Sequence, residues 1–305
     1  MKKTLIILTI ILAGVTAKSQ QSPISENYFM DRYSLAPSYA GNYNPKYLIT
    51  GYRSDWSGIT GGPKTFRLSY NDLFSFMKNA GYGGKIIYDK AGIFSQLYIL
   101  GSYSYNLKVN EDQHIMFGLS AGIYKNKLNF LDFYNDPKYT LDPSLISANI
   151  NSKLKFMSDI SAVWAYKKIE AGIMFSNISF GYASYKEANL KYNPLSNFQV
   201  HVVYQYNINE KWDINPLVLY RGGQNIKGQL EVASQFVWQK KLFVNLVYRD
   251  PDIIGFGLGA NISNFLKIGY NFNYATNVAM GALNNHEVSL GINISEFILK
   301  RTSPE

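Results

Sequence analysis

The histidines of this 305-residue chain are the first side chains to test for chemistry, because histidine serves as a metal ligand and as a general base. The chain has three, His114, His201 and His286, each in a different predicted strand. No two stand at metal-ligand spacing, and there is no His-Glu-x-x-His motif. His201, beside Gln199 and Gln205 on one strand face, is the best single candidate for catalysis, but a hydrogen-bonded interior histidine explains it better.

The sequence also lacks a complete calcium site, a complete phosphate-binding loop and a thiol nucleophile. Asp250 and Asp252 flank Pro251 in a predicted outer turn, but two carboxylates do not supply the six to eight oxygens of a calcium site. The stretch 79–86 lacks the first glycine and the Ser/Thr of a phosphate-binding loop. The chain has no cysteine and therefore no thiol nucleophile. We expect no enzyme activity, no catalytic residue, no metal and no cofactor.

Composition narrows the class of protein. The chain is 47% hydrophobic, 15% aromatic and only 17% charged, whereas about a quarter of the residues of a soluble globular protein are charged. Its 30 basic and 21 acidic residues give a formal charge of +9. The basic residues are scattered and form no run of five or six, so a nucleic-acid partner is not expected. The composition indicates a folded or membrane-embedded chain.

The first seventeen residues have the make-up of a secretory signal peptide. Two lysines precede the apolar run 5–13, and the small-residue pattern Val-Thr-Ala follows at 15–17. We expect cleavage after Ala17 or a few residues later near Gln20, and hence a mature protein that leaves the cytoplasm. The remaining sequence has nothing close to the roughly 18 uninterrupted apolar residues of a transmembrane helix. A membrane would therefore have to be crossed by strands.

Alternation of apolar and polar residues predicts strands with two unlike faces. In 198–208 one parity is apolar and aromatic while the other is mostly polar, and 253–262 and 285–295 show the same period. Segments of about nine to twelve residues match a tilted membrane-crossing strand, whereas globular strands average about five or six. This length favours a barrel with lipid outside and polar groups inside over a soluble sandwich.

The connections give an independent indication of a barrel. Tight junctions at 167–168, 209–210, 239–240 and 263–264 alternate with longer connections, so the long loops share one rim. Greek-key connections of a sandwich mix lengths at both ends. We predict fourteen strands, at 47–56, 64–72, 80–89, 93–107, 112–125, 155–167, 168–178, 198–208, 211–221, 227–239, 240–249, 253–262, 265–275 and 285–295.

The expected fold is an all-β, closed, antiparallel transmembrane β-barrel of about fourteen strands over 47–295. The signal peptide 1–17 is followed by a segment, 18–46, that is either periplasmic or a plug of the lumen, and 296–305 form a C-terminal tail. Pro216 argues against the strand boundaries around it, because proline cannot donate to a ladder.

Aromatic residues lie mostly toward the ends of the predicted strands, where amphipathic rings sit at lipid headgroups. We expect Tyr98, Tyr124 and Trp164 among them to lie at that depth.

Short motifs stand near both ends of the mature chain. They are Leu-Ala-Pro-Ser-Tyr-Ala-Gly at 35–41, Tyr-Arg-Ser-Asp-Trp-Ser-Gly-Ile at 52–59 with Gly-Pro-Lys-Thr at 62–65, and two late stretches at 267–274 and 285–290. In order and spacing they resemble the PorP/SprF family of outer-membrane proteins associated with the type IX secretion system, over nearly the whole mature chain. The motif residues are Pro37, Tyr39, Gly41, Arg53, Trp56, Gly58, Gly62, Pro63, Thr65, Gly269, Tyr270, His286 and Glu287.

The resemblance implies a non-enzymatic barrel in the cell outer membrane. It implies partners of two kinds: a secreted surface protein with a type IX C-terminal sorting domain, as in gliding motility, and periplasmic parts of the secretion machine. Outer-membrane lipid surrounds such a barrel. Two departures from the family are Ala36, where an asparagine is usual, and a C-terminal tail without a final aromatic residue. Each motif residue has either a structural role or a role in partner contact.

Other function classes stay open at this point. A diffusion channel or a transporter of lipids or other hydrophobic molecules would use the polar inner face as a water path or solute site. A soluble secreted sandwich adhesin comes next, and a barrel hydrolase built around a residue such as His201 comes last.

Overall fold

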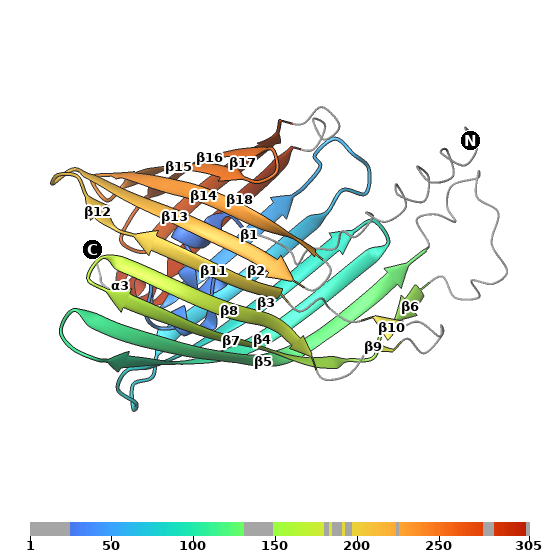
Figure 1. Ribbon diagram of the computed structural model, residues 1–305, viewed down its shortest axis with the longest axis horizontal. Coiled ribbons are helices and arrows are strands. Elements are labelled where there is room, and N and C mark those ends of the chain that lie inside the picture. Colours follow the sequence, from blue (N-terminus) through green and yellow to red (C-terminus); the bar gives the residue numbers. More distant parts are fainter. Residues whose placement is uncertain are drawn as a thin grey trace, which may run out of the picture.

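Fourteen long antiparallel strands form one closed barrel in the computed structural model (Figure 1). Each strand pairs with its neighbour in the chain, and β1 (Tyr47–Ser54) closes the ring against β18 (Asn285–Asn293). The predicted closed all-β barrel is therefore confirmed. The structure describes residues 25–130, 149–179, 183–184, 191–192, 197–223, 226–276 and 284–302, so the expected signal peptide lies outside the described residues.

The strand boundaries lie within four residues of those expected. The largest difference is at the end of β5, which continues to Asn129 because the short strand β6 (Asn149–Asn151) pairs with it there. The other barrel strands are β2 (Lys64–Leu73), β3 (Ala80–Ala91), β4 (Phe94–Lys108), β5 (Gln113–Asn129), β7 (Lys155–Tyr166), β8 (Ile169–Ser179), β11 (Asn197–Tyr204) with its continuation β12 (Tyr206–Asn207), β13 (Trp212–Gly223), β14 (Ile226–Trp238), β15 (Leu242–Arg249), β16 (Ile253–Asn261) and β17 (Leu266–Ala275). The short strands β9 (Ala183–Ser184) and β10 (Lys191–Tyr192) pair with each other.

Along each strand, side chains alternate between the outside and the inside of the barrel, as the period of the sequence predicts. On β11, Val200 and Val202 are exposed on the outside while His201 and Val203 are buried inside. The rings of Tyr98 and Tyr124 differ from the expectation, because both are buried with their centroids 4.9 Å apart. Each has the inward parity of its strand, so it lies within the lumen and away from the headgroups.

Pro216 lies within β13 and the strand continues through it. The neighbouring strand is interrupted between Tyr204 and Tyr206, where β11 ends and β12 begins. Between these two residues, the Gln205 N–H donates to the carbonyl of Lys168 on the other side. The missing N–H of proline therefore falls where the ladder between the two strands is broken, which explains why the strand tolerates it.

The N-terminal residues 25–46, called the inner segment below, lie within the barrel as three short 3₁₀ helices, drawn blue in Figure 1. These helices are η1 (Asn27–Phe29), η2 (Arg32–Ser34) and η3 (Pro37–Tyr39). Every residue from Glu26 to Ala40 except Ser34 is buried.

The two rims of the barrel differ. Helix α3 (Ile294–Thr302) follows β18 at the rim that carries only short turns, called the short-turn rim below. The connections 55–63, 130–154, 180–196 and 276–284 all leave the opposite rim, called the long-loop rim below. Within the described residues, no helix has the length and apolarity needed to cross a membrane.

A charged residue on the outer face tests whether that face meets hydrocarbon. Val232 is exposed on the outside at the middle of β14, so Val232→Arg should cost about 2–4 kcal/mol of folding free energy in lipid vesicles. Leu242→Arg is the matched control, since Leu242 is exposed at the first residue of β15 on the short-turn rim; there the cost should be about 0–1 kcal/mol. Denaturant titration of the vesicle-inserted barrel measures both, and equal costs would contradict the assignment.

Candidate functional site

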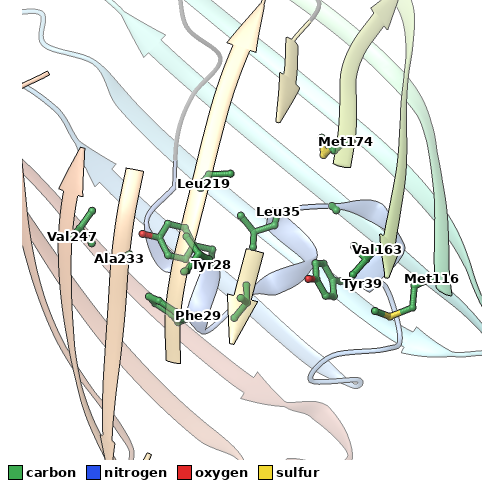
Figure 2. Close-up of a cluster of buried hydrophobic side chains, with 13 residues drawn as sticks. Tyr28, Phe29, Leu35, Tyr39, Met116, Val163, Met174, Leu219, Ala233 and Val247 are labelled. Atoms are coloured by element: carbon green, nitrogen blue, oxygen red, sulfur yellow. The ribbon is translucent and has the colours of Figure 1, made fainter. Parts of the chain in front are cut away.

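The inner segment packs an apolar surface against the lumen wall (Figure 2). Tyr28, Phe29, Leu35 and Tyr39 are buried against inward side chains of seven strands. The wall residues of this cluster are Met116, Val163, Met174, Val203, Leu217, Leu219, Ala233 and Val247. In an aqueous lumen these side chains would contact water, which costs about 25 cal/mol of free energy for each Å² of apolar surface. The wall is therefore shaped to hold the inner segment.

Glycines in the wall let the inner segment approach the strands closely. A side-chain carbon at Gly118 on β5 would lie 2.0 Å from the backbone nitrogen of Ser38. One at Gly83 on β3 would lie 2.6 Å from the ring of Tyr33. In the absence of these carbons, the N–H of Ser38 donates to Ser161 Oγ at 2.9 Å. Small inward residues thus make room for a second layer of chain.

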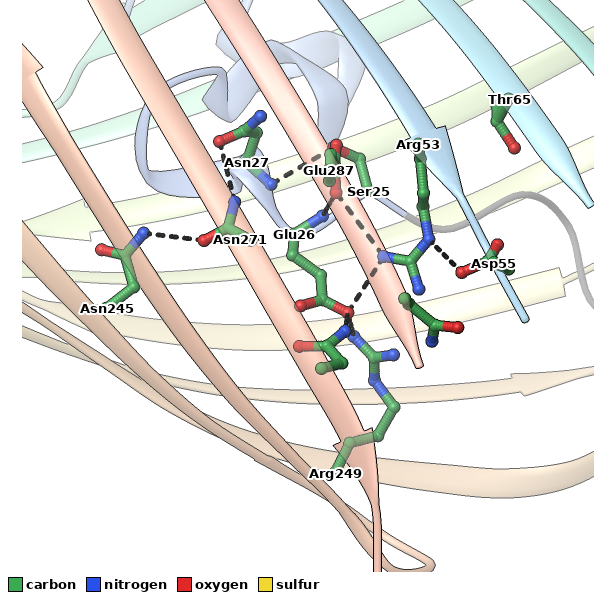
Figure 3. A network of polar contacts seen from close by, with 12 residues as sticks. Ser25, Glu26, Asn27, Arg53, Asp55, Thr65, Asn245, Arg249, Asn271 and Glu287 are labelled. Atoms are coloured by element: carbon green, nitrogen blue, oxygen red, sulfur yellow. Dashed lines mark hydrogen bonds and ion pairs between the residues drawn. The ribbon is translucent and has the colours of Figure 1, made fainter. Parts of the chain in front are cut away.

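The motif residues Arg53 and Glu287 meet at the strand pair that closes the barrel (Figure 3). They stand directly opposite each other on β1 and β18, and both are buried on the inner face. Between them lies Glu26 of the inner segment, whose Oε1 accepts from Arg53 Nη1 at 3.0 Å and from Arg249 Nη2 at 2.6 Å. Three distant parts of the chain therefore share one carboxylate.

Glu287 holds the backbone and a side chain at the start of the inner segment. Its carboxylate accepts from Ser25 Oγ at 2.7 Å and from the N–H of Glu26 at 2.9 Å. Arg53 Nε donates a hydrogen bond to Asp55 Oδ1 at 2.7 Å, and Arg53 Nη1 lies 3.5 Å from Glu287 Oε2. The guanidinium of Arg53 thus connects the barrel seam, the first loop and the inner segment.

Arg249 extends the network to β14 and β15. Its Nε donates to Glu231 Oε2 at 2.5 Å, and Arg221 Nη1 donates to the same oxygen at 3.1 Å. Asn273 also donates to Glu26 Oε1. Burial alone would raise the pKa of Glu26, but the charges of Arg249 and Arg53 lower it to about 2. Glu26 is therefore ionised inside the barrel.

A second polar cluster joins the inner segment to β8 and β11. The Tyr39 hydroxyl donates to Glu170 Oε2 at 2.9 Å and lies 3.0 Å from His201 Nε2. Arg32 pairs with the same carboxylate. Burial raises the pKa of the Tyr39 phenol, so the hydroxyl keeps its proton. His201 is thus a buried side chain in a hydrogen-bonded cluster that contacts the inner segment, which is the arrangement expected of an interior histidine.

The other lumen-side motif residues contact the inner segment or adjacent strands. Gly41 has a φ of +71° and donates its N–H to Asn71 Oδ1 at 2.8 Å. Thr65 Oγ1 donates to Asp89 Oδ1 at 2.6 Å. Gly269 faces inward, and a side-chain carbon there would lie 3.8 Å from the sulfur of Met30. Pro37 begins η3.

The remaining motif residues lie at the long-loop rim and on the outer face. Trp56, with a φ of +54°, and Gly58, with a φ of +104°, lie in the β1–β2 connection, whose ends are joined by a bond from the N–H of Asp55 to the carbonyl of Pro63. At Gly62 a side-chain carbon would lie 2.6 Å from the Asp55 carbonyl oxygen. On the outer face, the Tyr270 hydroxyl is 2.7 Å from His286 Nδ1.

The structure thus brings Arg53 and Glu287 together in the lumen and separates them from the Tyr270–His286 pair outside. Glu26, Glu231 and Arg249 are not among the residues that the sequence motifs indicate. Glu231 and Arg249 stand directly opposite each other on β14 and β15, and both have inward parity. Opposite charges at facing inward positions, in a chain poor in charge, are a signal that could have identified them. Within the described part of the chain, no three His, Asp or Glu residues form a metal-binding group.

Neutralising Glu26 should destabilise the barrel, because two buried guanidinium groups would lose a partner. We expect Glu26→Gln to cost about 3 kcal/mol at neutral pH, measured by denaturant unfolding in detergent or vesicles. The control Asp112→Asn removes an exposed pair with Lys167 at 3.9 Å and should cost less than about 1 kcal/mol. Because the folded-state pKa of Glu26 is about 2 against an ordinary 4.5, its contribution is present above about pH 4.5 and is lost as the pH falls toward 2. The difference between wild type and Glu26→Gln should therefore shrink below pH 4.5, and a difference independent of pH would contradict this reading.

Comparison with known proteins agrees with the architecture. The structure described as "CymD monoaromatic hydrocarbon channel" aligns with a TM-score of 0.51 and 11% identity, covering 92% of this chain and 94% of that one. A "KdgM porin" aligns with a TM-score of 0.39 and 10% identity over 81% of this chain and 98% of the other. At 11% identity the likeness to the CymD channel shows the fold alone. No curated protein sequence matches the chain.

A family profile described as "Type IX secretion system membrane protein PorP/SprF" matches residues 17–292. The match spans the inner segment and the barrel strands up to the next-to-last residue of β18, so it covers both parts of the site described above. The chain therefore belongs to the PorP/SprF family of type IX secretion system membrane proteins.

Proposed function

We propose that this protein is a non-enzymatic barrel of the outer membrane that assists type IX secretion, or anchors a secreted surface protein, by docking that protein's C-terminal sorting domain. Membership of the family supports the secretion role. The fold supports a position in the outer membrane, where bacterial barrels of even strand number are found. The docking surface would be the long-loop rim, since the lumen is occupied by the inner segment.

The observation that carries this proposal is the packing of the inner segment within the lumen. A carrier of folded or extended cargo, or a channel for solutes, needs a continuous path through the barrel. Here residues 26–33 and 35–40 are buried against the wall by apolar, hydrogen-bonded and ionic contacts. A partner would therefore be recognised at the outside or at the rims.

Partners of two kinds fit the two rims. The long-loop rim faces the cell exterior in barrels of this type, so it suits a secreted surface protein. The short-turn rim, with α3, faces the periplasm and suits components of the secretion machine. The orientation of such barrels and membership of the family support both assignments, and changes at each rim should give separable phenotypes.

Shortening the longest connection tests the docking surface. Residues 131–148 lie outside the described residues and connect β5 to β6. Deleting them while keeping both strands should reduce surface retention of the secreted partner severalfold, because the partner would lose part of its contact area. Heat-modifiable gel mobility should stay unchanged, which shows that the barrel assembles. Unchanged retention in a correctly assembled barrel would refute docking at this loop.

Conductance tests the rival channel function. The purified barrel in a planar bilayer should pass little steady current, because the inner segment fills the lumen. An open porin recorded in the same bilayer serves as the reference. A steady conductance close to that of the porin would favour the channel reading over the docking proposal.

A further inference from the structure

The start of the inner segment lies close to the long-loop rim. Ser25, its first residue, donates its hydroxyl to Glu287 Oε1 at 2.7 Å, and the N–H of Glu26 donates to Glu287 Oε2 at 2.9 Å. Glu287 is the third residue of β18, which begins at the connection 276–284 on that rim. A strand rises about 3.3 Å per residue, so these bonds lie about 7 Å from the rim along the strand.

The contacts of the Glu26 carboxylate place it near the same rim on three other strands. It binds Arg53, the next-to-last residue of β1, and Arg249, the last residue of β15. It also accepts a hydrogen bond from Asn273, two residues before the end of β17. All three strands end at the long-loop rim. Four strands, β1, β15, β17 and β18, therefore hold the start of the inner segment there (Figure 3).

The end of the inner segment lies at the opposite rim. The carbonyl of Lys46 accepts a hydrogen bond from the N–H of Ile294, the first residue of α3, at 2.9 Å. Tyr47 follows as the first residue of β1 and pairs with Asn293, the last residue of β18. Both strand ends belong to the short-turn rim. Residues 25–46 therefore pass through the lumen from one rim to the other.

The wall between Ser25 and the short-turn rim is covered by the inner segment itself. Asn271 Nδ2, directly opposite the Glu287 position on β17, donates to Asn27 Oδ1 at 3.2 Å. Further along the inner face, a side-chain carbon at Gly291 would lie 3.2 Å from the terminal carbon of Met30. A second chain running back along this part of the wall would clash with these residues.

The length of the preceding chain also argues against a return to the short-turn rim. Cleavage after Ala17 would leave residues 18–24 before the inner segment, and seven residues span at most about 25 Å when fully extended. From Glu287, β18 continues for six residues to Asn293, which is about 20 Å. A return would therefore need an almost fully extended chain along an occupied wall, whereas the long-loop rim is about 7 Å away.

We propose that the chain enters the barrel from the long-loop rim, so the mature amino terminus lies on the same side of the membrane as the long loops and opposite to α3. Fourteen strands alone return a chain to the rim where it began, and the inner segment adds one further passage before β1. The amino terminus then joins the surface that meets a secreted partner and is out of reach of periplasmic components. This exterior assignment rests on the placement proposed above, whereas the shared side with the long loops does not.

Single cysteines, introduced into a chain that has none, report the side of each position. Ser22→Cys lies before the inner segment, Ser144→Cys in the connection after β5, and Ser303→Cys directly after α3. A membrane-impermeant maleimide is added to intact cells and to cells with a permeabilised outer membrane. On intact cells, Ser22→Cys should be labelled as strongly as Ser144→Cys, and Ser303→Cys at least tenfold less. All three should be labelled after permeabilisation, and their heat-modifiable mobility should match that of wild type.

An inserted epitope covers the case in which the thiol at position 22 is shielded. Placed between Gln21 and Ser22, it stays in the mature chain after cleavage at either expected position, and an antibody should detect it on intact cells. If the thiol at 22 and the epitope become accessible only after permeabilisation, like the thiol at 303, the proposal is overturned. If positions 22 and 144 are both protected on intact cells while 303 is labelled, the shared side stands and the proposed orientation in the outer membrane is wrong.

Discussion

The carboxylate of Glu26, held between Arg53 and Arg249, is the interaction on which the arrangement of this protein depends. Buried charges are tolerated only when they are paired and hydrogen-bonded. Removing the inner segment would leave the guanidinium groups of Arg53 and Arg249 close together without the carboxylate of Glu26 that they share. Arg53 lies on the first strand and Glu287 on the last, so the same cluster links the occupant of the lumen to the closing strand pair. Barrel closure and the filling of the lumen are therefore coupled.

This coupling makes the barrel a packed domain. Its outer face is apolar because lipid contacts it. Its inner face combines polar residues with an apolar patch because the inner segment packs against it. Glycines such as Gly83 and Gly118 let the inner segment come within contact distance of the wall. With the interior occupied, the surfaces left for recognition are the two rims and the lipid-facing wall, and their chemistry differs. This division of surfaces is what favours a docking role over transport through the lumen.

The fold could be predicted from the sequence because its signal is local. A period of two, strand length and the order of short and long connections are each read within a few residues, and hydrocarbon imposes them on every strand. The position of the inner segment could not be predicted, because its partners are far away in the chain. Glu26 and Arg249 are 223 residues apart. Tyr98 and Tyr124 show the same limit: their ring character suggested a headgroup position, whereas the parity of their strands places them inside. The resemblance identified Arg53 and Glu287 as family residues, and only the register shows that they face each other.

The central claim, that the inner segment occupies the lumen, is tested most directly by cross-linking in the membrane. The chain has no cysteine, so a pair introduced as Ser38→Cys and Ser161→Cys would be the only thiols present. Because the Ser38 N–H bonds to Ser161 Oγ, this pair should form a disulfide in intact membranes and resist water-soluble thiol reagents. The pair Ser38→Cys and Ser289→Cys, with Ser289 on β18, should not form one. If the cysteines at 38 and 161 stay reduced and react freely with the reagent, the inner segment lies elsewhere and the account is wrong.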